Sequence, residues 1–232
     1  MMTGKRKQLL AGSGFLLLLI FSSVKCYSQD FEFSLHADPL LSWMSSNNSS
    51  YDGEGVRPGV SLGLDMVRYF DDNYGFKAGI GFFTAGGRLS AADRHVMVFN
   101  NRTDTIAAGD EMIYNLRYLN IPAGLHLRTN QIGYVTVFTD VGIDLRFLLR
   151  STVDIPANEV NNELASKETY GINMGWHIAA GIEYELGIKS SIITGLGFDQ
   201  DFFDITKDLV NAQQPEDRSG LRFVRIKFGI KF

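Results

Sequence analysis

The chain has 232 residues, among them 24 glycines and 5 prolines, with 12% aromatic residues and a formal net charge of −4. This acidic balance argues against a nucleic-acid partner, because such proteins present a basic surface. After Phe21 the sequence lacks the repeated runs of about 20 apolar residues that a helical membrane protein needs, which leaves the all-β class of membrane proteins as the one that fits abundant glycine and aromatic residues.

The first 28 residues have the three parts of a secretory signal peptide. Lys5-Arg6-Lys7 precedes an apolar run at 15–21, and small or polar residues follow it. The run is too short for a comfortable transmembrane helix of about 20 residues, although a retained signal anchor is the alternative. We therefore expect residues 1–28 to form a cleaved signal peptide and residues 29–232 to form one domain.

Cys26 is the only cysteine in the sequence. A lipoprotein would carry its acyl chains on this residue, but Lys25 stands where a lipobox requires a small side chain. Cleavage after Ser28 would remove Cys26, so the mature chain would have neither a disulfide nor a metal ligated by cysteine. It would also remove four cationic residues and no acidic one, changing the formal net charge from −4 to −8.

From residue 31 onward the sequence alternates apolar and polar residues, which is the period of a strand with two different faces. The first strand starts at Phe31 and extends toward Trp43. Pro122 lies inside a later strand and predicts a bulge or an edge-like interruption. Another short strand is expected at 95–99. The remaining long strands are expected near 60–66, 76–83, 113–128, 135–147, 170–185, 192–198 and 221–232.

The last strand has the clearest pattern. From Val224 the even positions are apolar and the odd ones are cationic or small, and the chain ends on Phe232. This resembles the closing strand of a bacterial outer-membrane barrel, in which the apolar residues face lipid and the terminal aromatic residue is an assembly signal. The last strand of a soluble antiparallel sheet is the alternative.

The connections between these strands alternate in length. Short turns are expected near Asp72, Asn130 and Gly187, and long polar loops near 45–55, 88–112, 151–169 and 204–219. Short turns at one rim and long loops at the other indicate an eight-stranded antiparallel up-and-down transmembrane β-barrel, with periplasmic turns and extracellular loops. A soluble β-sandwich has no physical reason to keep short turns at one end and long loops at the other. A lipocalin would carry G-x-W on its first strand, which is not present.

Tyr118-Leu119-Asn120-Ile121-Pro122 resembles the Y-L-x-I-P segment in the fourth strand of the PorT-like outer-membrane β-barrel family, common in Bacteroidota. The resemblance extends from the signal peptide through eight strands to Phe232. It implies a barrel in the outer membrane and no assigned activity, since most members have none. The family is named for a component of a secretion and gliding apparatus.

The interior of an eight-stranded barrel is just wide enough for side chains to fill. The residues expected to face inward carry both signs of charge, and burying one sign alone would cost several kcal/mol per ion. We therefore expect a salt-bridged plug, with a narrow pore for small solutes as the alternative. The expected lumen charge network consists of Glu32, Asp65, Lys77, Arg128, Asp140, Asp144, Arg146, Glu183, Arg225 and Lys227.

Few residues in the sequence suggest chemistry. His36, His126 and His177 are expected to face inward from different strands, with nothing to place them at one height, so we expect neither a metal nor a cofactor. Asp199 and Asp201, near an extracellular strand end, are candidates for a barrel enzyme acting on lipid or peptide at the outer rim, but no motif ties a serine or histidine to them.

The sequence thus favours a non-enzymatic barrel of the bacterial outer membrane with both termini in the periplasm. Its expected role is that of a structural or adhesive surface protein, or of a subunit in a secretion-type envelope complex. The expected partners are outer-membrane lipid, the barrel-assembly machinery and an envelope-complex protein bound through the long extracellular loops, and no nucleic acid.

Overall fold

The computed structural model describes residues 31–232 except 47–50, 54, 92–94, 99–102, 159, 168, 188–189 and 207–218. The predicted signal peptide and its cleavage site lie outside the described residues. Among the residues that are described, no helix has the length and apolar character needed to span a membrane.

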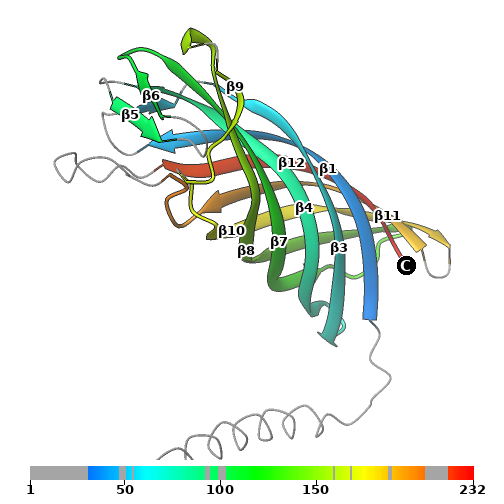
Figure 1. Ribbon diagram of the computed structural model, residues 1–232. Helices are drawn as coiled ribbons and strands as arrows, with labels where there is room; N and C mark the ends of the chain where they lie inside the picture. The colour runs from blue at the N-terminus through cyan, green and yellow to red at the C-terminus, as the bar shows by residue number, and fades with distance from the viewer. Residues whose placement is uncertain are drawn as a thin grey trace, which may run out of the picture. The chain divides into compact units, whose positions relative to one another are not determined.

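Eight long antiparallel strands form a closed barrel, as predicted (Figure 1). Each strand pairs with its neighbours in sequence, and the last strand pairs with the first from Ser34 to Ser46, which closes the sheet on itself. The wall strands are β1 (Phe31–Ser46), β3 (Arg57–Asp71), β4 (Tyr74–Ala91), β7 (Glu111–Arg128), β8 (Val135–Ile155), β10 (Ile172–Gly187), β11 (Ser190–Asp201) and β12 (Ser219–Lys231).

The two ends of the barrel differ. At one end, residues 72–73 join β3 to β4 and residues 129–134 join β7 to β8. At the other end, which we call the long-loop end, additional short elements gather (Figure 1). β2 pairs with β4, β9 pairs with β8, and β5 and β6 form a separate hairpin. These elements are β2 (Tyr51–Gly53), β5 (His95–Val98), β6 (Thr103–Ile106), the 3-10 helix η1 (Pro156–Asn158) and β9 (Val160–Leu164).

The predicted long loops at 88–112 and 151–169 were therefore partly wrong. β4 continues to Ala91, β7 starts at Glu111 and β8 continues to Ile155. The wall extends toward the long-loop end because β4 and β7 stay paired as far as Ser90 and Glu111, and β7 and β8 as far as Ile113 and Asp154.

The outer face carries an apolar band. On β8 it runs from Val137 to Leu149. The outward side chains between these two residues, such as that of Ile143, are about half exposed. Thirteen residues cover about 40 Å along a strand, or about 30 Å along the barrel axis at the usual tilt of about 40°. That height matches the hydrocarbon core of a bilayer, about 30 Å. Such a continuous apolar surface is suited to lipid rather than to water.

Of the two alternatives predicted for Pro122, the interruption is found and the bulge is not, because the ladder between β4 and β7 skips Pro122 and Ile121. The pairs Ala78–Ala123 and Gly81–Asn120 keep the same register on both sides of this proline. The register shift of β7 lies instead between Arg117 and Tyr118, where it pairs with β8. Proline removes one ladder hydrogen bond but inserts no extra residue, so the inward and outward alternation passes through it unchanged.

The interior changes character along the barrel. Charged residues, which the sequence predicted to face inward, occupy the half nearer the short turns. Toward the long-loop end the filling is an apolar core that the sequence analysis did not predict. This core consists of Leu40, Met44, Phe83, Ala85, Leu89, Ile106, Met112, Tyr114, Leu116, Tyr118, Val153, Ile155, Val160, Ala165, Ile205, Leu221 and Phe223.

Candidate functional site

The structure places all ten residues of the expected lumen charge network on the inner face of the wall. They lie in three layers, which we call the rim, middle and upper layers from the short-turn end upward. The side chains of Glu32 and Arg128 in the rim layer are about a quarter exposed, at 24% and 25%, whereas those of Asp144 and Arg146 in the upper layer are 0% exposed. Burial thus increases toward the apolar core.

The rim layer is organised around Glu32. Its carboxylate accepts hydrogen bonds from Arg128 Nη1 and from the Tyr69 hydroxyl, both at 3.0 Å, and lies 2.9 Å from Lys231 Nζ. Lys231 also pairs with Glu183. The Arg128 guanidinium stacks on the Tyr69 ring at 3.8 Å from its centroid. These contacts connect strands from opposite sides of the barrel across its short-turn end.

The middle layer is a square of two lysines and two aspartates. Lys77 Nζ lies 2.6 Å from Asp140 and 2.9 Å from Asp65. Lys227 Nζ lies 3.0 Å from Asp65 and 3.5 Å from Asp140. The four side chains come from β3, β4, β8 and β12, so the square links four strands. Alternating charges at these distances balance one another, which is the condition under which ions are tolerated in a buried site.

The upper layer surrounds Arg146. This guanidinium pairs with Asp201 and lies 3.4 Å from both Asp144 and Asp199. Arg225 Nε lies 3.3 Å from Asp199, so a second cation shares the acidic cluster. The other side of Arg146 faces the apolar core, with its guanidinium carbon 5.1 Å from the Phe223 ring centroid. Arg146 therefore joins the charge network to the apolar core.

The three inward histidines each turn Nδ1 toward an aspartate. His36 and His126 both contact the middle layer, because His36 Nε2 lies 3.4 Å from Asp65 and His126 pairs with Asp140, whereas His177 contacts the upper layer. The pairs are His36 with Asp38 at 2.8 Å, His126 with Asp140 at 2.5 Å and His177 with Asp144 at 2.8 Å.

Glycines make room for these rings. A Cβ at Gly63 would lie 2.4 Å from His36 Nε2, and one at Gly142 would lie 2.8 Å from His177 Cε1. Each of these glycines is the register partner of its histidine. The sequence contained this signal, but it becomes readable only once the register between strands is known.

Asp144, His177 and Asp199 bring one ligand atom each within 4.8 Å of one another, a spacing that could hold a metal ion. Their carboxylates already face cations, because Arg146 lies between the two aspartates and Arg225 lies against Asp199. We therefore assign no metal to this cluster.

Asp199 and Asp201, considered above as candidates for chemistry at the outer rim, do not lie at an exposed rim. Asp199 is 0% and Asp201 5% exposed, and both belong to the Arg146 cluster.

The comparison with known families now decides the class of protein. Residues 27–207 match the outer membrane protein beta-barrel domain family, which accounts for most of the chain. The chain belongs to this family. It is an integral protein of the bacterial outer membrane, and the apolar band on the wall is its surface toward lipid.

Solved structures that resemble this chain come from several bacteria. Neisserial surface protein A is 12% identical, with a TM-score of 0.46 over 86% of this chain and 95% of its own. OprG from Pseudomonas aeruginosa is 12% identical, with a TM-score of 0.47 over 88% and 97%. Ail of Yersinia pestis is 10% identical, with a TM-score of 0.44 over 88% and 99%. Likeness at this level concerns the fold alone. No curated protein matches the chain significantly.

The expected assembly signal of this outer-membrane barrel, Phe232, lies at the short-turn end. Its backbone N–H donates to the Phe33 carbonyl at 2.8 Å and its carbonyl accepts from the Phe33 N–H at 3.0 Å. The two rings stack with their centroids 6.4 Å apart. The Phe232 side chain is nevertheless 59% exposed, so most of the ring stays accessible on the outer face.

We expect Phe232→Ala to reduce the amount of folded barrel in the outer membrane several-fold, because it removes the exposed terminal ring while the backbone pairing with Phe33 is retained. The measurement is the yield of heat-modifiable protein in isolated outer membranes. Phe228→Ala is the matched control, since Phe228 on the same strand is also 59% exposed and faces outward. Equal losses in both variants would show that only lipid-facing area matters, and not the terminal position.

Proposed function

We propose that this outer-membrane barrel is a non-enzymatic structural or adhesive surface protein, or a subunit of a secretion-type envelope complex, with a closed lumen. The observation that carries the proposal is the filling of the interior by the charge network and the apolar core. Arg146, Tyr118 and Phe138 are among the largest fully buried side chains of the described residues, and all three point inward from the wall.

Two spaces that separate the layers of the charge network, among the described residues, are small. The cavity between the rim and middle layers, beside Lys77 and Glu183, has a volume of about 10 Å³. The one between the middle and upper layers, beside Asn120 and His177, has about 20 Å³. Roughly 10 to 15 Å³ is needed for a single water molecule. Passage of a solute would therefore require the ion pairs of the middle layer to separate.

With a closed lumen, the remaining surface for recognition is the long-loop end. There β2 and β9 extend the wall, and β5 and β6 form a hairpin of their own. Loops held on a rigid scaffold are where binding usually resides. This location supports a protein partner in the envelope or an adhesive contact outside the cell.

We further propose that the chain is a PorT-like member of its family. The segment that carries this resemblance occupies a structurally demanding place. Tyr118 stacks on Phe83 with ring centroids 5.1 Å apart, and the Asn120 side chain donates to Asp144 at 2.9 Å. Ile121 faces lipid. The segment thus contacts both the apolar core and the charge network. These two different environments explain why the segment combines an aromatic residue, an amide and an apolar residue in a fixed order.

Single-channel recording in a planar bilayer tests the closed lumen. We expect no steady opening from the purified barrel, because the middle layer balances its charges internally. A large, stable conductance would contradict the proposal if Lys77→Glu or Arg225→Glu abolished it. Arg68→Glu is the control, since Arg68 lies on β3 at a position that alternates outward.

The partner is tested by capture of the native protein from its own membrane after mild crosslinking. The proposal expects another envelope protein to be retained, and expects its loss when the β5–β6 hairpin, residues 95–106, is replaced by a short glycine-serine linker. Retention that is unaffected by this replacement would assign binding to another surface.

A further inference from the structure

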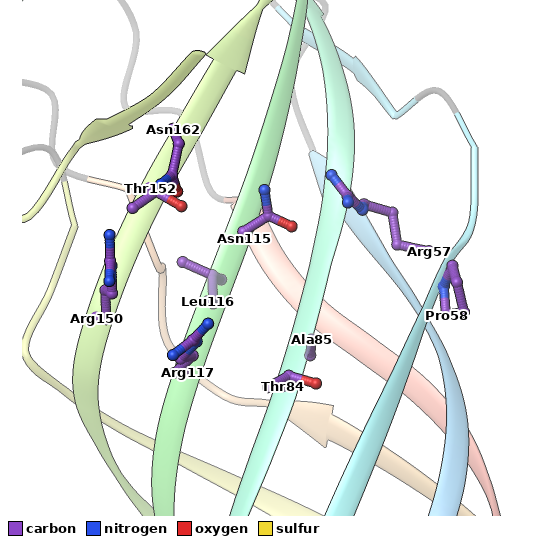
Figure 2. Close-up of a pocket in the computed structure, with 10 residues that line it drawn as sticks. All are labelled: Arg57, Pro58, Thr84, Ala85, Asn115, Leu116, Arg117, Arg150, Thr152 and Asn162. Atoms are coloured by element: carbon purple, nitrogen blue, oxygen red, sulfur yellow. The ribbon is translucent and has the colours of Figure 1, made fainter.

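A polar recess lies on the outer wall of the barrel, near the long-loop end. Its volume is about 290 Å³, at the lower limit of the usual range of small-ligand sites. Three arginines contribute to its lining, together with the polar side chains of Thr84, Asn115 and Thr152 (Figure 2). The arginines come from three different strands: Arg57 from β3, Arg117 from β7 and Arg150 from β8.

Two of the arginines face each other. Arg117 and Arg150 are register partners on the adjacent strands β7 and β8, and both are exposed. They point outward because their neighbours Leu116 and Ser151 are buried inside the barrel. Figure 2 shows them side by side on the two strands. Like charges directly opposite each other in an antiparallel pair are unfavourable unless a counterion lies between them.

Arg57 is the first residue of β3, where the pairing between β3 and β4 has already ended at Val60 and Thr84. Its side chain lies over the resulting notch, with Cδ 3.5 Å from the position a Cβ would take on Gly86 of β4. Arg57 Nη1 is removed from solvent and has no hydrogen-bond partner. Because a water-sized probe does not reach this nitrogen, it cannot itself contact a bound anion, and Arg57 contributes to the recess through its positive charge.

Within the part of the chain that the structure describes, no carboxylate lies within 4.0 Å of these three guanidinium groups. Asp154 is the acidic residue on the same outer face of β8. Its carboxylate is engaged by the Asn115 side-chain amide at 3.1 Å and by the Asn162 backbone N–H at 2.5 Å. The recess therefore has three cationic groups, and no described residue supplies them with a counterion.

The position of the recess relative to the apolar band identifies the class of anion. On the side of the recess toward the short-turn end, the outward residues are Leu119 on β7 and Leu149 on β8, and both belong to the outward apolar face. On β4, the outward residue before the recess is Phe82, which is 56% exposed. The arginines thus begin where the lipid-facing band ends, at the level of the headgroups. In outer-membrane barrels the end with long loops faces the cell exterior.

We propose that this recess binds the phosphate group of an outer-leaflet lipid, with the acyl chains of that lipid lying against Phe82, Leu119 and Leu149. Arg117 and Arg150 provide paired N–H donors for the phosphate oxygens, and Arg57 adds a third positive charge to the lining of the recess. Arginine suits this role because its planar fork matches phosphate oxygens two at a time. The bound lipid also removes the repulsion between Arg117 and Arg150.

Native mass spectrometry of the folded barrel, released from a neutral detergent with added phosphatidic acid, tests the site. We expect the wild type to retain phosphatidic acid in preference to phosphatidylcholine with the same acyl chains. The double variant Arg117→Gln and Arg150→Gln should bind phosphatidic acid at least tenfold more weakly. Arg222→Gln, at an outward-alternating position of β12, is the matched control and should change binding less than twofold. Heat-modifiable migration confirms that each variant is folded.

Equal retention of the two lipids, or a double variant that binds like the wild type, would overturn the proposal. Competition by millimolar inorganic phosphate as effective as competition by phosphatidic acid would overturn its lipid part, because the acyl chains would then contribute nothing. The double variant Arg117→Lys and Arg150→Lys should bind phosphatidic acid more weakly than the wild type. Lysine retains the positive charge but lacks the planar guanidinium group that binds two phosphate oxygens at once.

Discussion

Replacing Arg146 by methionine is expected to lower the free energy of unfolding by at least about 3–5 kcal/mol, the cost of leaving buried carboxylates without their partner. Arg146 is 0% exposed and faces Asp144, Asp199 and Asp201 together. Methionine is shorter than arginine but close to it in volume, so the change removes charge and hydrogen bonds more than volume. Equilibrium urea unfolding in phosphatidylcholine vesicles measures the effect.

A second substitution distinguishes electrostatic loss from a packing defect. Arg146→Met combined with Asp201→Asn leaves Asp199 opposite Arg225 and Asp144 in contact with His177, and it removes the carboxylate that lost its partner Arg146. We expect this double variant to recover at least half of the lost stability. Arg150→Met, on the same strand but exposed on the outer wall, should change stability by less than about 1 kcal/mol. A similar loss in Arg150→Met, or no recovery in the double variant, would contradict the role given to Arg146.

The alternation of apolar and polar residues was enough to predict the wall of the barrel. In a strand, successive side chains point to opposite faces, so the inward position of Asp65, Lys77 or Asp140 follows from its place in the strand alone. The number of strands followed in the same way from counting segments between turns. Both are local properties that a single sequence displays without knowledge of the partners.

The pairing inside the barrel could not be predicted in this way. Lys227 meets Asp65 across a sequence separation of 162 residues, and Arg146 meets Asp201 across 55. These contacts depend on the register between strands and on the stagger of the closed barrel, neither of which is a local property. The glycine opposite each of His36 and His177 is decided by the same register.

The apolar core at the long-loop end was missed for another reason. Leu89, Met112 and Val153 alternate with outward residues that are themselves polar, such as Arg88 and Asp154, because these strands have left the lipid band. In the sequence alone, polar outward residues that alternate with only a few apolar ones resemble a loop. The buried face becomes recognisable only when the three strands are paired.

Leu89→Ala tests whether this core is part of the folded barrel. Leu89 is 1% exposed, and it pairs with Met112 at the point where β4 and β7 leave the lipid band. Truncating a buried leucine costs about 2–5 kcal/mol. We expect the loss to appear as local opening, with amide hydrogen exchange at residues 85–91 and 111–116 at least tenfold faster, while Asp140 and Lys227 in the middle layer keep their protection.

Leu62→Ala is the matched control, because Leu62 on β3 is 56% exposed to lipid or detergent and does not contribute to the apolar core. It should leave exchange at 85–91 and 111–116 unchanged. Fast exchange of these segments already in the wild type would show that the long-loop end is not packed in solution. The lumen would then be closed by the charge network alone. The absence of conductance expected of the wild type would in that case rest on the charge network, without a contribution from the apolar core.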